Sequence, residues 1–577
     1  MPSRTSISST STALPLDDPW NNATRSRILC RMPLDLPLRA PAADLLSRYR
    51  AEGLRRDQGF GAFFDEHLTR CAPLTVRIWS RSNAYTGTVG AVHDASRRFA
   101  TGLQALGIRP GDVVTYQLSN RVETLVTLYG AALAGATLVP IVHFYGPHEV
   151  RFILEQVGAR VHITAADFGS VDYRETIRVV RADIPGVEHV VLVGDGTVPG
   201  TQPFTDLVDA APLSSLPSVD PDAPALIGYT SGTTAEPKGV VHTGNTIGAE
   251  IEQLRRYEVG ASRPLLTGAP LAHAIGLTSG AVLPLVRNQP LHIIDRWEPE
   301  WVLAIMAEAE LTSGSGATYF LTSLLDAPGF DAHHAELMES VGLGGSPVPG
   351  AVCDRAEGLG IRTTRCYGST EHPTISGARN SDPPELRKYT DGGLLDGVEV
   401  RIVDDDGRDV PPGTVGEVLS RGPDLFAGYT DPALTRAAVD ADGWYHTEDL
   451  GNLDERGFLT ITDRKKDIII RGGENVSAAE VETLLLRMPG VSETAVVAAP
   501  DVRLGEHACA FLSMIPGHEP PSLPAVQDHL ERAGLARQKW PEELRIVTDY
   551  PRTPSGKITK YVLRDQLRRE VEEPGRG

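Results

Sequence analysis

Cysteine is scarce in this chain. Its 577 residues include five cysteines, and no two of them form a CxxC pair. The odd number and the wide spacing argue against a disulfide framework and against a cysteine zinc site; the five are Cys30, Cys71, Cys353, Cys366 and Cys509. We therefore expect a protein of the reducing cytoplasm.

Positive charge is also in short supply. The chain has 55 Lys plus Arg against 75 Asp plus Glu, a formal net charge of −20. Such a chain repels phosphate backbones and anionic lipid head groups. We expect no nucleic-acid partner, whereas a small anion bound in a cleft stays compatible with this composition.

A clear membrane span is missing as well. Two uncharged stretches, Thr124–Gly146 and Pro264–Val286, have 23 residues each and would be long enough to span a bilayer. Both contain internal proline and glycine, so we interpret each as a buried helix that runs into a core strand. The Ser/Thr-rich N-terminus has no continuous apolar segment, which argues against a secretory signal, and we expect residues 1–25 to form a disordered tail.

Helical and strand-like apolar patterns alternate along most of the chain. Helical spacing over Val92–Leu106 is followed by the strand candidate IRPGDVVTYQL, then by helical spacing over Val122–Ala134 and the strand candidate ATLVPIV. This alternation predicts an α/β fold with parallel and mixed sheets covered by helices, in an N-terminal domain of residues 26–462. Short alternating runs and turn clusters predict a β-rich subdomain over about 394–462.

A charged segment with paired glycines marks the start of a second domain. DRKKDIIIRGGENVSAAEVE begins at Asp463 and interrupts the apolar pattern, so we place a hinge in it. Ser477 and Glu480 have the spacing of a capping box, which predicts the start of a helix. The remaining residues, 463–577, are enough for a small mobile α+β domain.

The strand candidate ALIGYT, residues 225–230, leads into the loop SGTTAEPKG. Such a loop can wrap phosphate groups, because glycines let the backbone approach an anion and hydroxyl groups donate to its oxygens. Lys238 would offset the negative charge of the phosphates. The segment is not a Walker loop, since Lys238 comes before Gly239 rather than after it.

Five segments stand out in order along the chain: YTSGTTAEPKG at 229–239, YGSTE at 367–371, GWYHTEDLG at 443–451, DRKKDIIIRGGENVSAAEVE at 463–482 and PRTPSGKITK at 551–560. In this order they resemble the motifs of the adenylate-forming superfamily of acyl-CoA synthetases, peptide-synthetase adenylation domains and luciferases. The wording RGGENVSAAE is more similar to CoA ligases than to luciferases. The resemblance runs from about Tyr85 to the C-terminal end and does not cover residues 1 to about 60.

The resemblance implies a two-step reaction of a carboxylic acid. ATP is cut between its α and β phosphates, the acid becomes an acyl-AMP mixed anhydride, and the thiol of CoA then attacks the acyl group. Joining an anionic carboxylate to a polyanion requires cations and hydrogen-bond donors aimed at the reacting phosphorus. The implied cosubstrates are ATP and CoA, and the implied cofactor is Mg²⁺.

By resemblance, two motifs hold the phosphates. Thr370 would bond the α phosphate, and Glu371 would bind Mg²⁺, because oxygen ligands suit a hard cation. Thr230 and Glu371 are thereby implied in catalysis. The residues that would hold the β and γ phosphates are Thr230, Ser231, Gly232, Thr233, Thr234 and Lys238.

Two further motifs are implied to bind the adenosine and to join acid to phosphate. Tyr367 and Gly368 would lie against adenine, and Asp449 with Arg464 would hold the ribose hydroxyls by charge-assisted hydrogen bonds. Lys557 would bridge carboxylate and phosphate oxygens, a task suited to an ammonium on a flexible stem.

The thioester step is implied to need a rotation of the small domain, because the thiol must reach the acyl carbonyl where Lys557 stood. Lys466 occupies the position where relatives pivot. Gly472 and Gly473 would then lie along the pantetheine channel, where the absence of side chains leaves room.

The acyl pocket, by the same likeness, includes five residues without a full charge: His273, Thr318, Gly344, Gly345 and Ser346. A charged amino acid would need a fixed acidic partner, so we expect a neutral, apolar acid. The small residues suggest room for a bulky or medium-size acid, in fatty-acid or secondary metabolism. His273 would gate this pocket or fill it.

Three alternatives share these motifs. An acyl-AMP ligase would pass the acyl group to a separate carrier protein or partner enzyme, and dependence on CoA or on a carrier separates the two. A luciferase-like oxygenase would take up oxygen. A non-catalytic nucleotide-binding homologue would bind ATP without releasing pyrophosphate. The sequence leaves the oligomeric state open, with a homodimer among the options.

Overall fold

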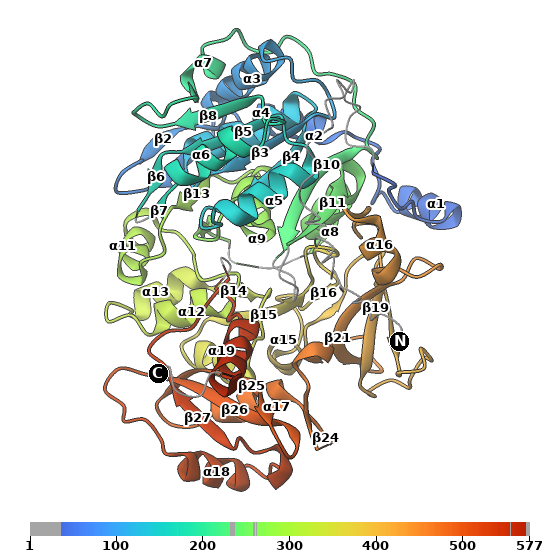
Figure 1. Cartoon of the computed structure of the whole chain (residues 1–577), viewed down its shortest axis with the longest axis vertical. Coiled ribbons are helices and arrows are strands. Elements are labelled where there is room, and N and C mark those ends of the chain that lie inside the picture. The colour runs from blue at the N-terminus through green and yellow to red at the C-terminus, as the bar shows by residue number, and fades with distance from the viewer. Residues whose placement is uncertain are drawn as a thin grey trace, which may run out of the picture.

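The computed structural model describes residues 36–169, 171–230, 237–257, 260, 262–472, 474–553 and 556–572. The expected tail over 1–25, the predicted phosphate-loop residues Ser231, Gly232, Thr233 and Thr234, and Gly473 lie outside the described residues. A large α/β part is followed by a small C-terminal α+β part, drawn in orange to red in Figure 1, so the predicted fold class is confirmed.

An eight-stranded mixed sheet forms the centre of the large part, with the strand order β20-β11-β10-β4-β3-β5-β8-β9. Strands β4, β3, β5 and β8 are parallel, as the alternating pattern predicts, whereas β11 is antiparallel to β10 and β20. The strands are β3 (Val113–Gln117), β4 (Thr137–Ile141), β5 (Val161–Ala165), β8 (His189–Val193), β9 (Gln202–Pro203), β10 (Pro224–Thr230), β11 (Lys238–Thr243) and β20 (Gly428–Tyr429).

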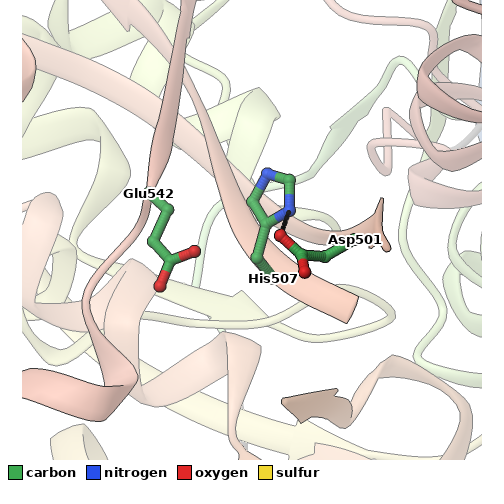
Figure 2. Close-up of side chains that lie close together, drawn as sticks. All are labelled: Asp501, His507 and Glu542. Carbon is green, nitrogen blue, oxygen red and sulfur yellow. Dashed lines mark ion pairs between the residues drawn. The ribbon is translucent and has the colours of Figure 1, made fainter. Parts of the chain in front are cut away.

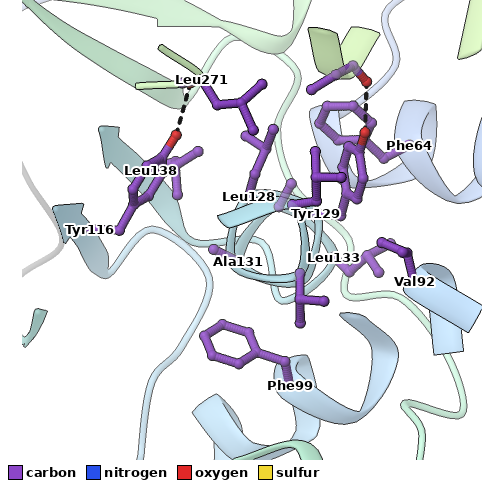
Figure 3. Packing of buried hydrophobic residues seen from close by; sticks show 14 of the residues in the cluster. Phe64, Val92, Phe99, Tyr116, Leu128, Tyr129, Ala131, Leu133, Leu138 and Leu271 are labelled. Atoms are coloured by element: carbon purple, nitrogen blue, oxygen red, sulfur yellow. Dashed lines mark hydrogen bonds between the residues drawn. The ribbon is translucent and has the colours of Figure 1, made fainter. Parts of the chain in front are cut away.

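Helix α4 (Val122–Leu133) is buried inside this part (Figure 3). Leu128 and Leu133 pack there among aromatic rings, and the hydroxyl of Tyr129 donates to the carbonyl of Ala281 at 2.7 Å. The stretch that has the length of a membrane span is therefore a core helix that runs into strand β4, as predicted. Within the described residues, no helix has both the length and the apolar composition that crossing a membrane requires.

The second uncharged stretch differs from the expectation. It begins with the short strand β12 (Leu266–Thr267) and continues as α9 (Ala274–Gly276), a π-helical segment (Leu277–Val282) and α10 (Leu283–Val286). Strand thus precedes helix, and the helix is irregular. Pro284 and the glycines of this stretch interrupt a regular α-helical ladder, which periodicity alone does not reveal.

Further sheets and helices complete the large part. One sheet has the order β12-β13-β1-β2, and another β14-β15-β16-β17. Their other strands are β1 (Thr75–Trp79), β2 (Tyr85–Thr88), β13 (Leu291–Ile294), β14 (Ser340–Leu343), β15 (Arg362–Tyr367), β16 (Ser376–Gly377) and β17 (Gly393–Leu394), and β6 (Asp167–Phe168) pairs with β7 (Val171–Asp172). The helices are α1 (Ala43–Ala51), α2 (Phe60–Arg70), α3 (Val89–Ala105), α5 (Pro147–Val157), α6 (Arg174–Asp183), α7 (Thr205–Val208), α8 (Gly244–Arg256), α11 (Pro299–Ala309), α12 (Thr318–Leu325), α13 (Ala332–Met338), α14 (Gly350–Gly358), α15 (Pro384–Tyr389) and α16 (Pro432–Ala438).

The region predicted to be β-rich contains an antiparallel sheet of order β18-β19-β21-β22. Its strands are β18 (Glu399–Val403), β19 (Gly416–Arg421), β21 (Tyr445–Leu453) and β22 (Leu459–Arg464). Strand β22 leads directly into a 3-10 turn, Lys465–Asp467, which contains the predicted hinge residue Lys466.

The C-terminal part is one sheet with helices packed on it. The order is β24-β23-β26-β25, and β27 also pairs with β26. Ser477 Oγ accepts the backbone N–H of Glu480 at 3.0 Å, as a helix cap should, but the Glu480 carboxylate binds Lys539 instead of closing a capping box. The elements are β23 (Ile469–Arg471), β24 (Glu474–Val476), α17 (Ala478–Leu485), β25 (Val491–Asp501), β26 (Gly505–Met514), α18 (Leu523–Arg532), the 3-10 turn Arg537–Lys539, β27 (Glu543–Ile546) and α19 (Lys560–Glu572).

Candidate active site

The predicted phosphate loop connects two paired strands. Thr230 ends β10 and faces Lys238, the first residue of β11, across the antiparallel ladder. Residues 231–236, which make up most of the connection, lie outside the described part of the chain. The Lys238 ammonium lies 5.6 Å from the centre of the Tyr429 ring, which places this cation over the neighbouring strand β20.

Tyr429 links that cation to the carboxylate predicted to bind metal. Its hydroxyl donates to Glu371 Oε1 at 2.7 Å, and the Glu371 side chain is buried. Burial and the Glu371 charge raise the pKa of Tyr429, so the phenol remains a neutral donor. Since Tyr429 occupies Oε1, the other oxygen, Oε2, is the atom that could ligate Mg²⁺, and a carboxylate oxygen is the donor that Mg²⁺ prefers.

The backbone of Thr370 is held in place by His242. His242 Nε2 lies 2.7 Å from the Thr370 carbonyl oxygen and donates to it, while His242 Nδ1 pairs with the Thr246 hydroxyl at 3.1 Å. A Cβ at Gly228 would lie 3.2 Å from the Thr370 methyl group, so β10 passes close beneath this residue. Gly368 is equally confined, because a side chain there would collide with the Pro373 carbonyl.

The predicted ribose pair is formed across a hairpin. Asp449 on β21 and Arg464 on β22 are register partners, and Arg464 Nε donates to Asp449 Oδ1 at 2.5 Å. The other oxygen of Asp449 accepts the Tyr367 hydroxyl at 2.6 Å. Asp449 is therefore buried between an aromatic ring and a guanidinium, and Glu448 beside it has a left-handed φ of 60° within strand β21.

Lys557, a residue of the small domain, lies near the pair formed by Asp449 and Arg464. It is half-buried, and its electrostatic neighbours include Arg464, Asp449 and Asp467. Burial, followed by the Arg464 charge, lowers the pKa of Lys557 to about 8, although Asp449 opposes this. Next to it, a Cβ at Gly556 would lie 3.2 Å from the Tyr319 ring of the large domain. Residues more than a hundred positions apart thus meet at one place, as the motif order implies.

The predicted hinge residue Lys466 lies in the 3-10 turn after β22, and the predicted CoA-channel residue Gly472 directly follows β23. Lys466 binds Glu448 Oε2 at 2.7 Å, one residue from the ribose carboxylate. Gly472 has a φ of 59°, and its N–H donates to the Leu504 carbonyl at 2.8 Å. In the described structure Gly472 therefore forms a turn within the small domain.

The predicted acyl-pocket residues lie together but leave less room than their small size suggests. A side chain at Gly344 would collide with the Cys366 sulfur, and one at Gly345 would lie 2.7 Å from Ile275. The Ser346 hydroxyl pairs with Thr318, so these two polar groups satisfy each other. The space near the glycines is thus filled by neighbouring side chains.

Half-buried His273 caps the short helix α9, where its Nδ1 accepts the Ile275 N–H at 3.4 Å. Burial lowers the pKa of His273 to about 4, so the imidazole is neutral at pH 7. The structure gives this side chain a capping role, and its role in the acyl pocket stays a prediction.

A cavity of about 350 Å³ lies beside the Lys557 loop. Aromatic side chains form much of its wall, and it also contains Asp295 and His143, each with a buried polar atom that has no hydrogen-bond partner. None of the five predicted acyl-pocket residues is among its lining residues. Its lining includes Phe168, Trp297, Tyr319, Phe320, Arg552 and Gly556.

A buried acidic pair behind the YGSTE motif was also missed. Thr374 donates to Glu250 Oε1 at 2.8 Å, and His372 lies between Ser420 and Asp424, at 2.8 and 3.2 Å. Glu250 and Asp424 interact electrostatically, and both are buried. His372, which directly follows this motif, is thus part of the core that supports it.

This pair makes stability depend on pH. Burial and the Asp424 charge raise the pKa of Glu250 to about 8, whereas an unfolded Glu ionises near 4.3. The fold keeps a proton that the unfolded chain loses, so stability should fall as pH rises from about 5 to about 8. The Glu250→Gln variant has no titrating group at this position and does not lose this stability. The difference in Tm between the variant and wild type, measured by scanning fluorimetry, should therefore become more positive as pH rises from about 5 to about 8. A constant difference would contradict the assignment, and Glu455→Gln, at an exposed turn, is the control.

Comparisons with known proteins identify the family of this chain. The family model described as AMP-binding enzyme matches residues 68–430, and the AMP-binding enzyme C-terminal domain matches residues 480–557. The chain is 32% identical over 530 residues to the medium-chain fatty-acid–CoA ligase of Escherichia coli (strain K12), covering 91% of this chain and 93% of that protein. It is 34% identical over 493 residues to the 3-[(3aS,4S,7aS)-7a-methyl-1,5-dioxo-octahydro-1H-inden-4-yl]propanoyl:CoA ligase of Rhodococcus jostii (strain RHA1), covering 83% and 93%. The crystal structure of ATP-bound MatB from Rhodopseudomonas palustris is similar with a TM-score of 0.77 at 25% identity, covering 89% of this chain and all of that chain.

Proposed function

This chain belongs to the AMP-binding enzyme family, within the adenylate-forming superfamily, and from that premise we propose that it is an ATP-dependent acyl-CoA synthetase. It would join a neutral, hydrophobic carboxylic acid to AMP with release of pyrophosphate and then transfer the acyl group to CoA. The similarity to two CoA ligases at 32% and 34% identity supports this reaction class.

The observation that carries the proposal is the position of Lys557. Its side chain comes from the C-terminal part and lies within electrostatic reach of Asp449 on β21 and Arg464 at the end of β22. Residues of three motifs, at 443–451, 463–482 and 551–560, interact electrostatically at this point. A protein that merely bound nucleotide would gain nothing from a cation of a second domain at this point.

Each group of the site would have its own role in the adenylation step. Asp449 and Arg464 would bind the ribose hydroxyls, which fixes the α phosphorus relative to Thr370. Mg²⁺, when bound by Glu371 Oε2, supplies positive charge to the phosphate oxygens. A carboxylate oxygen of the acid would attack the α phosphorus as pyrophosphate leaves, and Lys557 would hold the acid and phosphate oxygens together.

The thioester step would require the small domain to rotate about the hinge. Rotation about Lys466 would withdraw Lys557 and bring the Gly472 turn to the acyl carbonyl. The CoA thiol would form the thioester bond as AMP leaves. A carrier protein is the alternative acceptor of the acyl group from the same acyl-AMP intermediate.

A screen of acids tests this function. Pyrophosphate release should be measured with cyclohexanecarboxylate, benzoate and octanoate as alicyclic, aromatic and medium-chain probes, each with and without CoA. We expect at least one acid to give release that continues for many turnovers when CoA is present. Release that stops after one equivalent even with CoA would favour a carrier acceptor, and ATP binding without any release would favour a non-catalytic homologue.

The pH profile of adenylation should reflect the titration of the Lys557 ammonium. Because the pKa of Lys557 is about 8, kcat/KM for ATP in pyrophosphate exchange should fall as pH rises through that value. The negative charge of bound ATP favours the ammonium, so the fall in kcat should occur at higher pH. A Lys557→Arg variant that retains activity should lose this alkaline fall, because guanidinium stays charged. An unchanged fall in that variant would assign it to another group.

A further inference from the structure

A histidine and two carboxylates meet on the small domain, outside the site described above (Figure 2). They are Asp501 at the end of β25, His507 on β26 and Glu542 just before β27. One ligand atom of each lies within 4.8 Å of the other two. Three separate segments thus present a nitrogen and two oxygens to the same small volume.

The hydrogen bonds of His507 set which nitrogen faces the acids. His507 Nε2 lies 3.3 Å from Glu543 Oε2, and a carboxylate can only accept, so the proton is on Nε2 in the neutral ring. Nδ1 then carries a lone pair. This atom is buried without a hydrogen-bond partner, and it lies 3.8 Å from Asp501 Oδ2. A lone pair facing an anionic oxygen is unfavourable, and either a proton on Nδ1 or a metal cation between the two atoms removes the repulsion.

Each carboxylate keeps one oxygen available. Asp501 Oδ1 accepts the backbone N–H groups of Arg503 and Leu504, at 2.8 and 2.7 Å, which fixes the carboxylate and leaves Oδ2 toward His507. Arg471 binds Glu542 through Oε1, so Oε2 remains. The Arg471 charge weakens this site, because it already neutralises part of the Glu542 charge.

We propose that Asp501, His507 and Glu542 bind one divalent transition-metal ion of the Zn²⁺ class. Imidazole nitrogen with carboxylate oxygens suits Zn²⁺ and Co²⁺ better than Mg²⁺ or Ca²⁺. The contact from Glu543 to the far nitrogen is the outer-shell arrangement that orients metal-binding histidines. The side chains of Asp501 and Glu542 are 27% and 35% exposed, so an ion has access and a water can complete the coordination.

The site lies next to the turn of Gly472. Leu504, whose N–H binds Asp501, accepts the Gly472 N–H through its carbonyl, and Arg471 precedes that glycine. A bound ion would tie the 501–504 turn to the segment of Glu542. It would thereby make the surroundings of Gly472 more rigid, without contact to the nucleotide site.

Metal titration of the full chain tests the proposal. Protein stripped with a chelator and free of nucleotide is titrated with Zn²⁺ by calorimetry and with Co²⁺ by visible absorption. We expect one saturable site and Co²⁺ absorption bands typical of nitrogen and oxygen ligation. His507→Gln and Asp501→Asn should each weaken this binding at least tenfold, whereas the control His333→Gln, at an exposed histidine near Glu310, should leave it unchanged.

Two results would overturn the proposal. One is the absence of saturable binding by the wild-type chain. The other is equal binding by wild type, His507→Gln and Asp501→Asn, which would mean an adventitious ion only. The use of two separate variants keeps the test valid if one of them fails to fold, and circular dichroism identifies such a variant.

Discussion

Replacement of Lys557 by alanine is expected to slow adenylate formation by about 10²–10³-fold, the usual loss when one preorganised charge at a transition state is removed. The expectation depends on the place of this ammonium beside Asp449 and Arg464. The acid would then meet the nucleotide without the cation that offsets their repulsion. Pyrophosphate exchange measures this step directly.

The rate of the second half-reaction distinguishes the loss of a catalytic group in Lys557→Ala from misfolding of that variant. When synthetic acyl-AMP is supplied, Lys557→Ala should form the CoA thioester within about threefold of the wild-type rate, because this lysine would have left the site. Lys539→Ala is the matched control, since Lys539 pairs with Glu480 on the same domain. Pyrophosphate exchange by Lys557→Ala within threefold of wild type would refute the assignment.

Replacement of Asp449 by alanine should raise KM for ATP by about 10- to 100-fold, since a hydrogen bond to a charged group contributes about 1.5–3 kcal/mol. Asp449 is buried and bonds both Tyr367 and Arg464, so the variant loses the ribose acceptor and the alignment of its neighbours. KM for the acid should change by less than about threefold, because the acyl pocket is formed by other segments.

The comparison of the two KM values makes the Asp449 prediction specific. Glu455→Ala, an exposed acid on the turn between β21 and β22, removes the same charge from the same hairpin and should leave both values unchanged. A general disturbance of the hairpin would instead raise both KM values together in Asp449→Ala. That outcome would mean that Asp449 supports the fold and does not contact ATP.

The sequence predicted the fold class and the meeting of its motifs, because both depend on short contiguous patterns. Strand β4 and helix α4 follow from local apolar spacing, and Tyr367, Asp449 and Lys557 each belong to a recognisable motif. Their roles remain proposals, but their proximity is a property of the fold.

Long-range packing could not be predicted in the same way. Tyr429 contacts Glu371 from 58 positions away, and no spacing rule points to it. The glycines at 344 and 345 suggested an open pocket, yet Cys366 and Ile275 from other elements fill that space. Glu250 is an unremarkable helical acid in the sequence, and the tertiary fold alone places it beside Asp424. In each case the deciding contact joins segments whose separation in sequence carries no information about their distance.

The most direct test of the central claim follows one oxygen atom. An acid found in the screen is prepared with ¹⁸O in its carboxylate and turned over with ATP and CoA, and the products are analysed by mass spectrometry. If the acid attacks the α phosphorus, one of its oxygens stays with AMP after the thiol takes the acyl group, so AMP should carry a single ¹⁸O and pyrophosphate none. Unlabelled AMP, or formation of ADP and phosphate, would contradict acyl-adenylate formation by this chain.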